Sequence, residues 1–198
     1  MIKTWRDIPG FFDFQDVYDQ AVAEAHDGDT LVEVGTFLGK SAAYMAERIL
    51  EARKSVTFFA VDSWDPKQYA NWWIDVRQDP PSPWPVEELY GMPLNKAFSH
   101  CIHAVGAQRL IVPFRSPSVQ GATRFHDQSL SFVFIDANHL YDGISADISA
   151  WAPKIKPGGI LAGHDYRTKA WPDVTRAVDE TFGERVEHRN NSWLVRMP

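Results

Sequence analysis

The sequence has almost no cysteine and no cluster of basic residues. Cys101 is the single cysteine among 198 residues, which excludes an internal disulfide framework and a zinc site built from cysteines. Acidic residues outnumber basic ones by 26 to 20, for a formal net charge of −6. We therefore expect no non-specific binding to nucleic acid or to anionic membranes, because such binding needs clustered positive charge.

Long hydrophobic runs are also missing. No apolar stretch is long enough to cross a bilayer. The first residues carry charges at Lys3, Arg6 and Asp7 and lack the apolar core of a signal peptide. For this reason we expect the protein in the cytoplasm. We also expect one domain over residues 1–198, because a chain of this length can bury a core without disulfide bonds.

Segments typical of helices and strands alternate along the chain. Apolar residues at helical spacing predict a first helix after Asp13, which we expect to cap it. Short strands are predicted at 31–34, 56–61, 109–114, 130–136 and 159–163, and helices at 41–52, 94–106, 119–125, 143–152 and 172–182. Two last strands flank Asn190 and Asn191, a typical hairpin turn. This order predicts an α/β fold with a parallel sheet, to which the hairpin adds one antiparallel strand.

The first predicted strand leads through a glycine turn into a helix. Residues 33–41 read E-V-G-T-F-L-G-K-S, with Gly35 and Gly39 four positions apart. Such a turn presents free backbone N–H groups to a ligand, although the glycines can also serve packing alone. Their spacing differs from the G-x-G-x-x-G of dinucleotide enzymes, which disfavours an NAD-dependent oxidoreductase. Asp62 follows the second strand, where it can bind ribose hydroxyls or cap a loop; together these features predict a nucleoside-type cofactor.

Two further strands end in polar residues. The run F-V-F-I-D-A-N-H places Asp136 at a strand end and His139 three residues later, and G-I-L-A-G-H-D ends the next strand at His164 and Asp165. Adjacent strand ends would bring Asp136, His164 and Asp165 together, where carboxylates suit a hard cation such as Mg²⁺. A nearby histidine suits general base catalysis, since its ordinary pKa lies close to neutrality. Helix capping by the aspartates and packing of His164 on the sheet are the alternative.

Taken in order, these motifs resemble those of class I S-adenosylmethionine-dependent methyltransferases. They are most similar to the small group with F-I-D-x-x-H and P-G-G…H-D strand ends, alongside the catechol-type and macrolide-sugar O-methyltransferases. The resemblance covers about residues 29–166 apart from a Trp- and Pro-rich insert. It implies a Rossmann-like fold: a seven-stranded, mostly parallel sheet with a C-terminal antiparallel hairpin and helices on both faces. It also implies S-adenosyl-L-methionine as the cofactor.

The same resemblance implies roles for individual residues. The implied cofactor-binding positions are Glu33, Gly35, Thr36, Gly39, Ser41, Asp62, Ser63, Trp64, Ser116 and Asp136. Asp136, His164 and Asp165 match metal-ligand positions, with a histidine where the group usually has a carboxylate. His139 takes the position of the base, so His139 and Asp136 are the implied catalytic residues. Mg²⁺ is the implied metal, and a metal-independent enzyme is the alternative.

Aromatic residues make up 13% of the chain, and the insert at 63–93 contains four of the eight tryptophans and six of the thirteen prolines. Proline at this density opposes regular structure, while tryptophan faces suit contact with planar rings or sugars. We interpret 63–93 as a lid over the methyl acceptor, with Trp72, Trp73 and Trp84 as contacts. Burial of these rings, or a contact in a homodimer, is the alternative.

The sequence thus predicts O-methylation of a hydroxyl on a small sugar-like or phenolic acceptor, with His139 as the base. Tyr141 and Tyr166, which follow the two polar strand ends, are further candidate acceptor contacts. An N-directed or metal-independent methyltransferase remains open as an alternative. So does a protein that binds S-adenosylmethionine without catalysis. The acceptor itself is not predicted, because inserted loops rather than the fold select it.

Overall fold

The central sheet has the seven strands and the antiparallel hairpin that the sequence predicts. The computed structural model describes residues 1–69, 89 and 91–198. The strands are β1 (Thr30–Val34), β2 (Thr57–Asp62), β3 (Ile111–Arg115), β4 (Leu130–Ile135), β5 (Ile155–Gly163), β6 (Glu187–Arg189) and β7 (Ser192–Arg196). Within the described chain they form one sheet in the order β3-β2-β1-β4-β5-β7-β6. Strands β1 to β5 pair in parallel and β7 runs antiparallel to β5, which confirms the predicted architecture.

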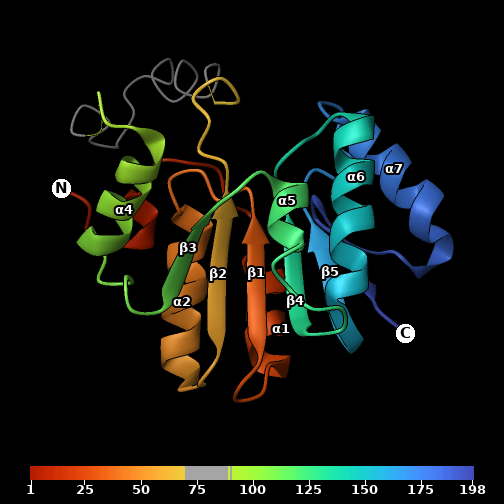
Figure 1. Ribbon diagram of the computed structural model, residues 1–198, viewed down its shortest axis with the longest axis horizontal. Coiled ribbons are helices and arrows are strands. Elements are labelled where there is room, and N and C mark those ends of the chain that lie inside the picture. The colour runs from red at the N-terminus through yellow and green to blue at the C-terminus, as the bar shows by residue number, and fades with distance from the viewer. Residues whose placement is uncertain (70–88, 90) are drawn as a thin grey trace.

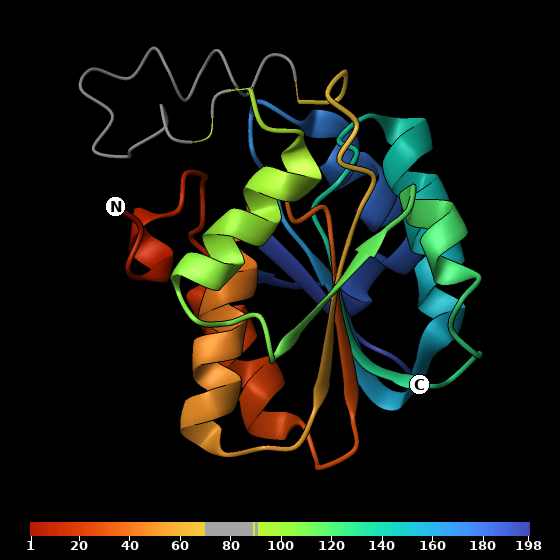
Figure 2. The same ribbon diagram turned by 60° about the vertical axis from the view of Figure 1, so that its left-hand side comes forward.

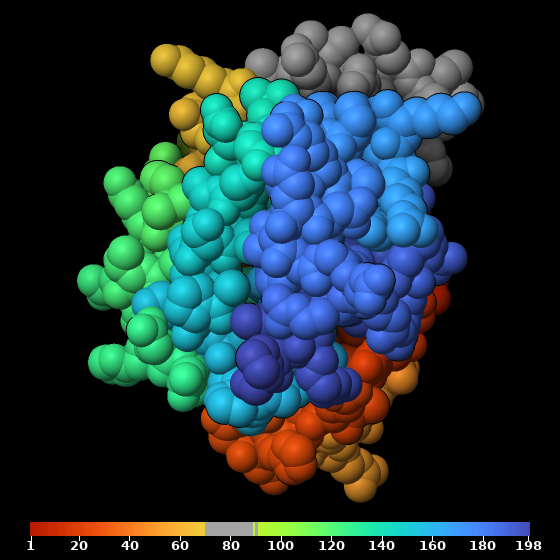
Figure 3. Space-filling view, turned by 90° about the vertical axis from the view of Figure 1, so that its right-hand side faces the viewer, coloured from red at the N-terminus to blue at the C-terminus, as the bar shows by residue number. Residues whose placement is uncertain are grey.

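Helices cover both faces of this sheet (Figures 1 and 2). One face carries the 3-10 turn η1 (Trp5–Asp7), α1 (Gln15–Glu24), α2 (Lys40–Ala52) and α4 (Leu94–Ala104). The other carries α5 (Ser118–Ala122), α6 (Tyr141–Trp151) and α7 (Pro172–Phe182), with the 3-10 turns η3 (Ala152–Lys154) and η4 (Gly183–Arg185). Figure 3 shows α6 and α7 side by side on this second face. In β4, Phe132 and Phe134 face the first layer while Val133 and Ile135 face the second, because side chains alternate along a strand.

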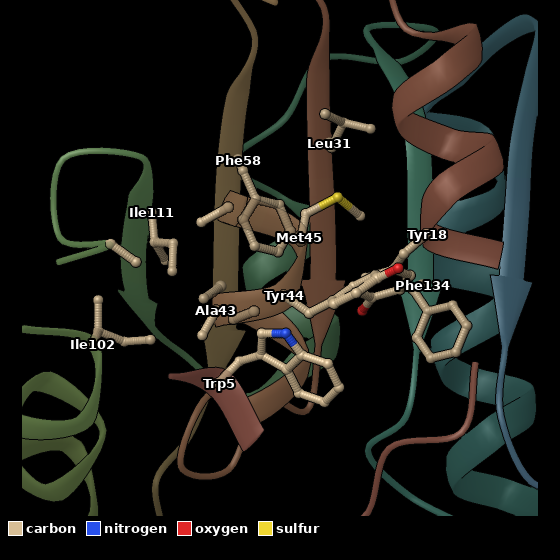
Figure 4. Packing of buried hydrophobic residues seen from close by; sticks show 14 of the residues in the cluster. Trp5, Tyr18, Leu31, Ala43, Tyr44, Met45, Phe58, Ile102, Ile111 and Phe134 are labelled. Atoms are coloured by element: carbon tan, nitrogen blue, oxygen red, sulfur yellow. The ribbon is translucent and has the colours of Figure 1, made fainter. Parts of the chain in front are cut away.

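Aromatic side chains fill much of the first helical layer (Figure 4). The rings of Trp5 and Tyr44 meet edge to face, with centroids 5.2 Å apart. Tyr18 of α1 packs against Phe134 of β4 in the same geometry, also at 5.2 Å. Such pairs add to the stabilisation that burial of the rings provides. These contacts join η1 to α2 and α1 to β4, the strand whose end carries the predicted catalytic residues.

The start of α1 differs from the prediction that Asp13 caps it. Phe14 occupies the cap position and makes no side-chain capping hydrogen bond. The Asp13 carboxylate instead accepts a hydrogen bond from Asn191 Nδ2 at 2.9 Å and lies 2.7 Å from His164 Nε2. Asp13, which we expected to cap α1, therefore connects the start of α1 to the end of β5 and to the hairpin.

The insert at 63–93 is described at residues 63–69, 89 and 91–93. Trp72, Trp73 and Trp84, predicted as acceptor contacts, lie outside the described residues. Their role and that of the insert as a lid stay predictions. Among the helices that are described, none has both the length and the apolar character needed to cross a membrane.

Candidate active site

The carboxyl ends of β1, β2 and β4 meet at one edge of the sheet, at the top of Figure 1. Backbone pairing continues one residue beyond the strands: Gly35 N–H donates to the Val61 carbonyl at 2.9 Å, and Asp136 N–H to the Val34 carbonyl at 2.8 Å. The chain after β1 leads to helix α2 on one face, and the chain after β4 leads to α6 on the other. The order of the strands therefore reverses between β1 and β4, where ligands bind in open α/β sheets.

The turn after β1 needs glycine at two positions for different reasons. Gly35 has a φ of +91°, and a Cβ there would lie 2.0 Å from the Asp136 carbonyl oxygen. Gly39 has a φ of +86°, and its Cβ would lie 2.7 Å from Phe98 Cε2 on α4. A side chain at either position would combine a strained backbone with a collision. Gly35 thus lets the turn lie directly on the end of β4, whereas Gly39 serves the packing of α2 against α4.

Glu33 is a buried acid next to this turn. Its side chain is 1% exposed, and the Ser41 hydroxyl donates a hydrogen bond to Oε1. Burial disfavours the charged form and raises the pKa of Glu33 to about 8, although the bond from Ser41 opposes the shift. Glu33 Oε2 and Thr36 Oγ1 are buried without a hydrogen-bond partner among the described residues. A cationic amino group bound here would donate to both atoms, and its charge would favour the ionised form of Glu33.

Asp62, at the end of β2, is oriented by the backbone around it. Its side chain is 4% exposed, and Oδ2 accepts hydrogen bonds from the N–H groups of Thr36 and Phe37 at 2.9 Å each. Oδ1 accepts one from Trp64 N–H at 2.7 Å, and the Tyr69 hydroxyl donates to Oδ2 at 2.6 Å. Burial raises the pKa of Asp62, and these hydrogen bonds oppose the shift. The glycine turn thus positions the carboxylate predicted to bind ribose.

Strained backbone surrounds the same carboxylate. Phe37 has a φ of 47° and Trp64 a φ of 46°, in the left-handed region that bulky residues rarely adopt. The Trp64 indole N–H donates to the Phe37 carbonyl at 2.8 Å, so the two strained residues hold each other. Asp165, at the end of β5, has a φ of 59°. Strain of this kind persists where the surrounding structure requires it, and it is frequent at functional sites.

Ser63 and Ser116, the remaining predicted cofactor residues, flank Asp62. Ser116 N–H donates to the Asp62 carbonyl at 2.8 Å. The Ser63 carbonyl accepts a hydrogen bond from Arg115 Nε at 3.2 Å, which ties the end of β3 to the end of β2. The predicted cofactor positions therefore all lie at the ends of β1 to β4, in the turns that follow them, or in the first turn of α2.

Asp136, His139 and Asp165 form a compact group at the ends of β4 and β5. His139 Nε2 lies 2.8 Å from Asp165 Oδ2 and 3.3 Å from Asp136 Oδ1. One ligand atom from each of the three lies within 4.8 Å of the others, close enough for one metal ion to bridge them. Burial acts to lower the pKa of His139, but the hydrogen bonds and charges of the two carboxylates outweigh it and raise the pKa to about 10.

His164, predicted as a metal ligand with Asp136 and Asp165, lies beside Asp165 at the edge of this group. His164 Nε2 lies 2.7 Å from Asp13 Oδ1, and its Nδ1 lies 3.5 Å from Asp165 Oδ2. Burial again acts to lower its pKa, and the neighbouring carboxylates raise it to about 9. The imidazole that contacts both strand-end carboxylates is that of His139. The reason is that Asp13 binds the far nitrogen of His164 and turns that ring toward α1.

The two tyrosines predicted as acceptor contacts point toward α7. The Tyr166 side chain is 2% exposed, and its hydroxyl donates to Asp179 at 2.5 Å. The Tyr141 hydroxyl donates to Glu180 at 2.5 Å. Both hydroxyls are thus engaged by the same helix. Within the described residues, these two hydroxyls contact α7 rather than the other predicted site residues.

Trp171 is an aromatic neighbour of His139 that the sequence analysis missed. The two rings stack with centroids 4.6 Å apart and planes 29° apart. Trp171 comes directly before Pro172, which opens α7, and it is partly exposed. No local pattern distinguishes it from the other tryptophans, because the contact arises only when α7 packs beside α6. Trp171 therefore forms one wall next to the histidine of the cluster.

Comparison with known proteins identifies the class of the molecule. Residues 32–166 match the family described as a methyltransferase domain. The chain belongs to this family of methyltransferase domains. The resemblance drawn from the sequence motifs is thereby confirmed.

Several solved structures share the fold at low sequence identity. CalS11, described as a TDP-rhamnose 3'-O-methyltransferase of calicheamicin biosynthesis, gives a TM-score of 0.58 at 15% identity, covering 92% of this chain and 76% of that one. The O-methyltransferase NovP gives 0.60 at 18% identity, with 92% and 78% covered. An S-adenosylmethionine-dependent O-methyltransferase from Thermotoga maritima gives 0.61 at 14% identity, with 96% and 67% covered. At these identities the likeness establishes the fold.

One curated relative is much longer than this chain. An uncharacterized protein of Sinorhizobium fredii, y4gI, is 24% identical over 135 residues. The match covers 68% of this chain and 13% of that protein, so the chain corresponds to about an eighth of the relative's length. The name of the relative specifies no reaction, so the acceptor has to be inferred from the site.

Proposed function

We propose that this methyltransferase acts on a hydroxyl of a small-molecule acceptor, sugar-like or phenolic, rather than on a nucleic acid or a membrane lipid. The supporting observation is the contact between the two halves of the proposed site, one at the ends of β1 and β2 and the other at the ends of β4 and β5. The turn at Gly35 lies directly on the backbone of Asp136, so the cofactor turn and the carboxylate–imidazole group share one wall. Methyl transfer needs such proximity between donor and acceptor. The description of CalS11 as a sugar O-methyltransferase supports an oxygen acceptor.

The residues at the ends of β1 and β2 fit S-adenosylmethionine. The Asp62 carboxylate suits its ribose hydroxyls. The buried acceptors Glu33 Oε2 and Thr36 Oγ1 suit the amino group at its methionine end, with Ser41 orienting Glu33. Bound there, the cofactor supplies an electrophilic methyl group on a positively charged sulfur.

His139 is the proposed general base. A hydroxyl is a weak nucleophile at neutral pH, so loss of its proton to a positioned base speeds the transfer. Asp136 and Asp165 contact Nε2 of the ring and stabilise the imidazolium that results. Trp171 stacks on the ring and limits its rotation. The acceptor oxygen would then be directed to the side of the crevice where the glycine turn lies.

Asp136 and Asp165 are the residues that would hold a divalent cation such as Mg²⁺, because their oxygens are ligands that this ion prefers. His139 is the base in this proposal rather than a third ligand of the ion, because a ring nitrogen that binds a metal cannot also accept a proton. When bound, the cation would lower the pKa of the acceptor hydroxyl and offset the carboxylate charge that keeps a proton on His139.

The test is a turnover assay on the full chain with S-adenosylmethionine. Sugars, phenols and glycosides would each be supplied with Mg²⁺ or with EDTA, and methylated product would be detected by mass. We expect product on a hydroxylated acceptor, with Mg²⁺ increasing the yield. Activity that survives EDTA would indicate the metal-independent alternative, and product on amines alone the N-directed one. Cofactor binding without turnover on any acceptor would favour a non-catalytic binding protein.

A separate variant tests the proposal that His139 is the general base. His139→Ala should lower turnover by about 100-fold or more while leaving the affinity for S-adenosylhomocysteine unchanged. His188→Ala is the matched control, because His188 is exposed on β6 and lies outside the cluster. Near-full turnover by His139→Ala, with the cofactor still bound, would show that His139 is not the base.

A further inference from the structure

Tyr69, in the loop after β2, contacts the carboxylate that the proposed function assigns to the ribose. Its hydroxyl donates to Asp62 Oδ2 at 2.6 Å. The Tyr69 ring stacks on Phe37, with centroids 5.0 Å apart and planes 25° apart, at the partly buried edge of the first core layer. The hydroxyl is thus brought to Asp62 by a packed ring.

Asp62 has little remaining capacity to accept hydrogen bonds. Oδ2 accepts the N–H groups of Thr36 and Phe37 in addition to the phenol, and Oδ1 accepts Trp64 N–H. Each carboxylate oxygen offers about two acceptor positions, so the three donors on Oδ2 leave no room there, while about one position stays open on Oδ1. The backbone donors belong to the turns that shape the site. The phenol is the one donor of the four that a side-chain movement could remove.

The phenol resembles a ribose hydroxyl in its chemistry. Burial and then the negative charge of Asp62 raise the pKa of Tyr69 well above its ordinary value. The phenol therefore keeps its proton and is the donor in a short O–H···O⁻ hydrogen bond. Ribose hydroxyls are also neutral donors that bind such a carboxylate at a β-strand end.

We propose that Tyr69 is an internal competitor for the ribose subsite: its hydroxyl occupies Asp62 and leaves it when the ribose of the cofactor binds. This inference rests on the proposed cofactor site at Asp62. The observed affinity for the cofactor is then lower than the intrinsic affinity, in proportion to the fraction of molecules in which Tyr69 is released from Asp62. Binding of the nucleoside is thereby coupled to the position of Tyr69.

The decisive variant is Tyr69→Phe, which keeps the stacked ring and removes the hydroxyl. Calorimetry on the full chain would measure the dissociation constant of S-adenosylhomocysteine for the wild type and the variant. Tyr44→Phe is the matched control, because the Tyr44 hydroxyl donates to the carboxylate of Asp19 at 2.7 Å on the α1–α2 surface. We expect Tyr69→Phe to bind about tenfold more tightly than the wild type and Tyr44→Phe to bind as the wild type does.

A second measurement tests whether the gain depends on the ribose. Adenosine and a dideoxy analogue that lacks both ribose hydroxyls would compete with S-adenosylhomocysteine in each variant. Tyr69→Phe should improve the binding of adenosine and leave that of the dideoxy analogue unchanged, since the analogue has no hydroxyl to replace the phenol. Without any ligand, the same variant should unfold at a lower temperature than the wild type, because it lacks the bond to Asp62.

Each outcome decides the question. Unchanged or weaker binding of S-adenosylhomocysteine by Tyr69→Phe would overturn the proposal, because Tyr69 would then orient Asp62 for the ribose. Equal gains for adenosine and its dideoxy analogue would overturn it as well. If all three folded proteins fail to bind S-adenosylhomocysteine, the proposed cofactor site is itself wrong. That result differs from a defect specific to Tyr69, because the control would share it.

Discussion

The two halves of the proposed site differ in how deeply their carboxylates are buried and in what those carboxylates bind. At the ends of β1 and β2, Glu33 and Asp62 are 1% and 4% exposed, and each is bound by hydroxyl or backbone donors. At the ends of β4 and β5, Asp136, His139 and Asp165 are partly exposed and bind one another. Hydrogen bonds from neutral donors fix the orientation of Glu33 and Asp62, whereas the carboxylates of the second half raise the proton affinity of His139. The first half therefore suits binding of a cofactor, which has the same structure in every reaction, and the second half suits proton transfer.

The largest effect on stability is expected at the glycine turn, which lies between the two halves. Gly35→Ala should destabilise the fold by about 3 kcal/mol or more, because its Cβ would lie 2.0 Å from the Asp136 carbonyl at a φ of +91°. Denaturant unfolding measures the loss, and binding of S-adenosylhomocysteine should fall with it.

Gly28→Ala is the control for backbone strain alone. Gly28 has a φ of +90°, and nothing lies within 4 Å of its Cβ position. We expect a loss of about 1 kcal/mol. Equal losses in the two variants would mean that strain explains both and that the turn is not packed tightly against β4.

A smaller effect is expected from Glu33, the buried acid of the first half, as a change of stability with pH. The pKa of Glu33 is about 8 in the folded protein against an ordinary 4.5, so the folded chain binds this proton more tightly than the unfolded chain does. The resulting stabilisation is complete below the ordinary pKa and is lost as pH rises through the folded value. Glu33→Gln has no such proton. Its stability relative to the wild type should therefore rise by about 2 kcal/mol from about pH 5.5 to about pH 7.

Urea unfolding at several pH values measures this difference. Glu47→Gln, at an exposed position on α2, controls for the loss of one negative charge. A stability difference for Glu33→Gln that stays constant with pH would contradict the assignment of Glu33 as a neutral buried acid.

The smallest effect is expected at the outer end of the second half. Asp13→Ala removes the partner of His164 and Asn191, but the Asp13 side chain is 50% exposed, so water screens the pair. We expect a loss of at most about 1 kcal/mol in thermal unfolding, with S-adenosylhomocysteine still bound. A loss as large as that of Gly35→Ala would show that Asp13 supports the sheet rather than only the His164 ring.

Much of the fold and of the cofactor half could be predicted because the relevant geometry is encoded by contiguous residues. The glycine turn follows β1 within five residues, and Gly35 needs a conformation that other residues avoid. Asp62 ends the neighbouring strand, and the ends of parallel strands converge at one edge. The hairpin likewise depends on Asn190, which adopts the left-handed φ of 51° that a tight turn requires.

The sequence by itself determined the order of elements, the cofactor turn and the presence of acids and histidines at two strand ends. Only the tertiary structure decided which histidine joins the carboxylates. His164 is drawn to Asp13, 151 positions away, and Trp171 reaches His139 from the start of α7. The contact of Tyr69 with Asp62 likewise depends on its packing against Phe37. The physical reason is that a side chain's direction follows its hydrogen-bond and packing partners, and distant segments supply those partners only after folding.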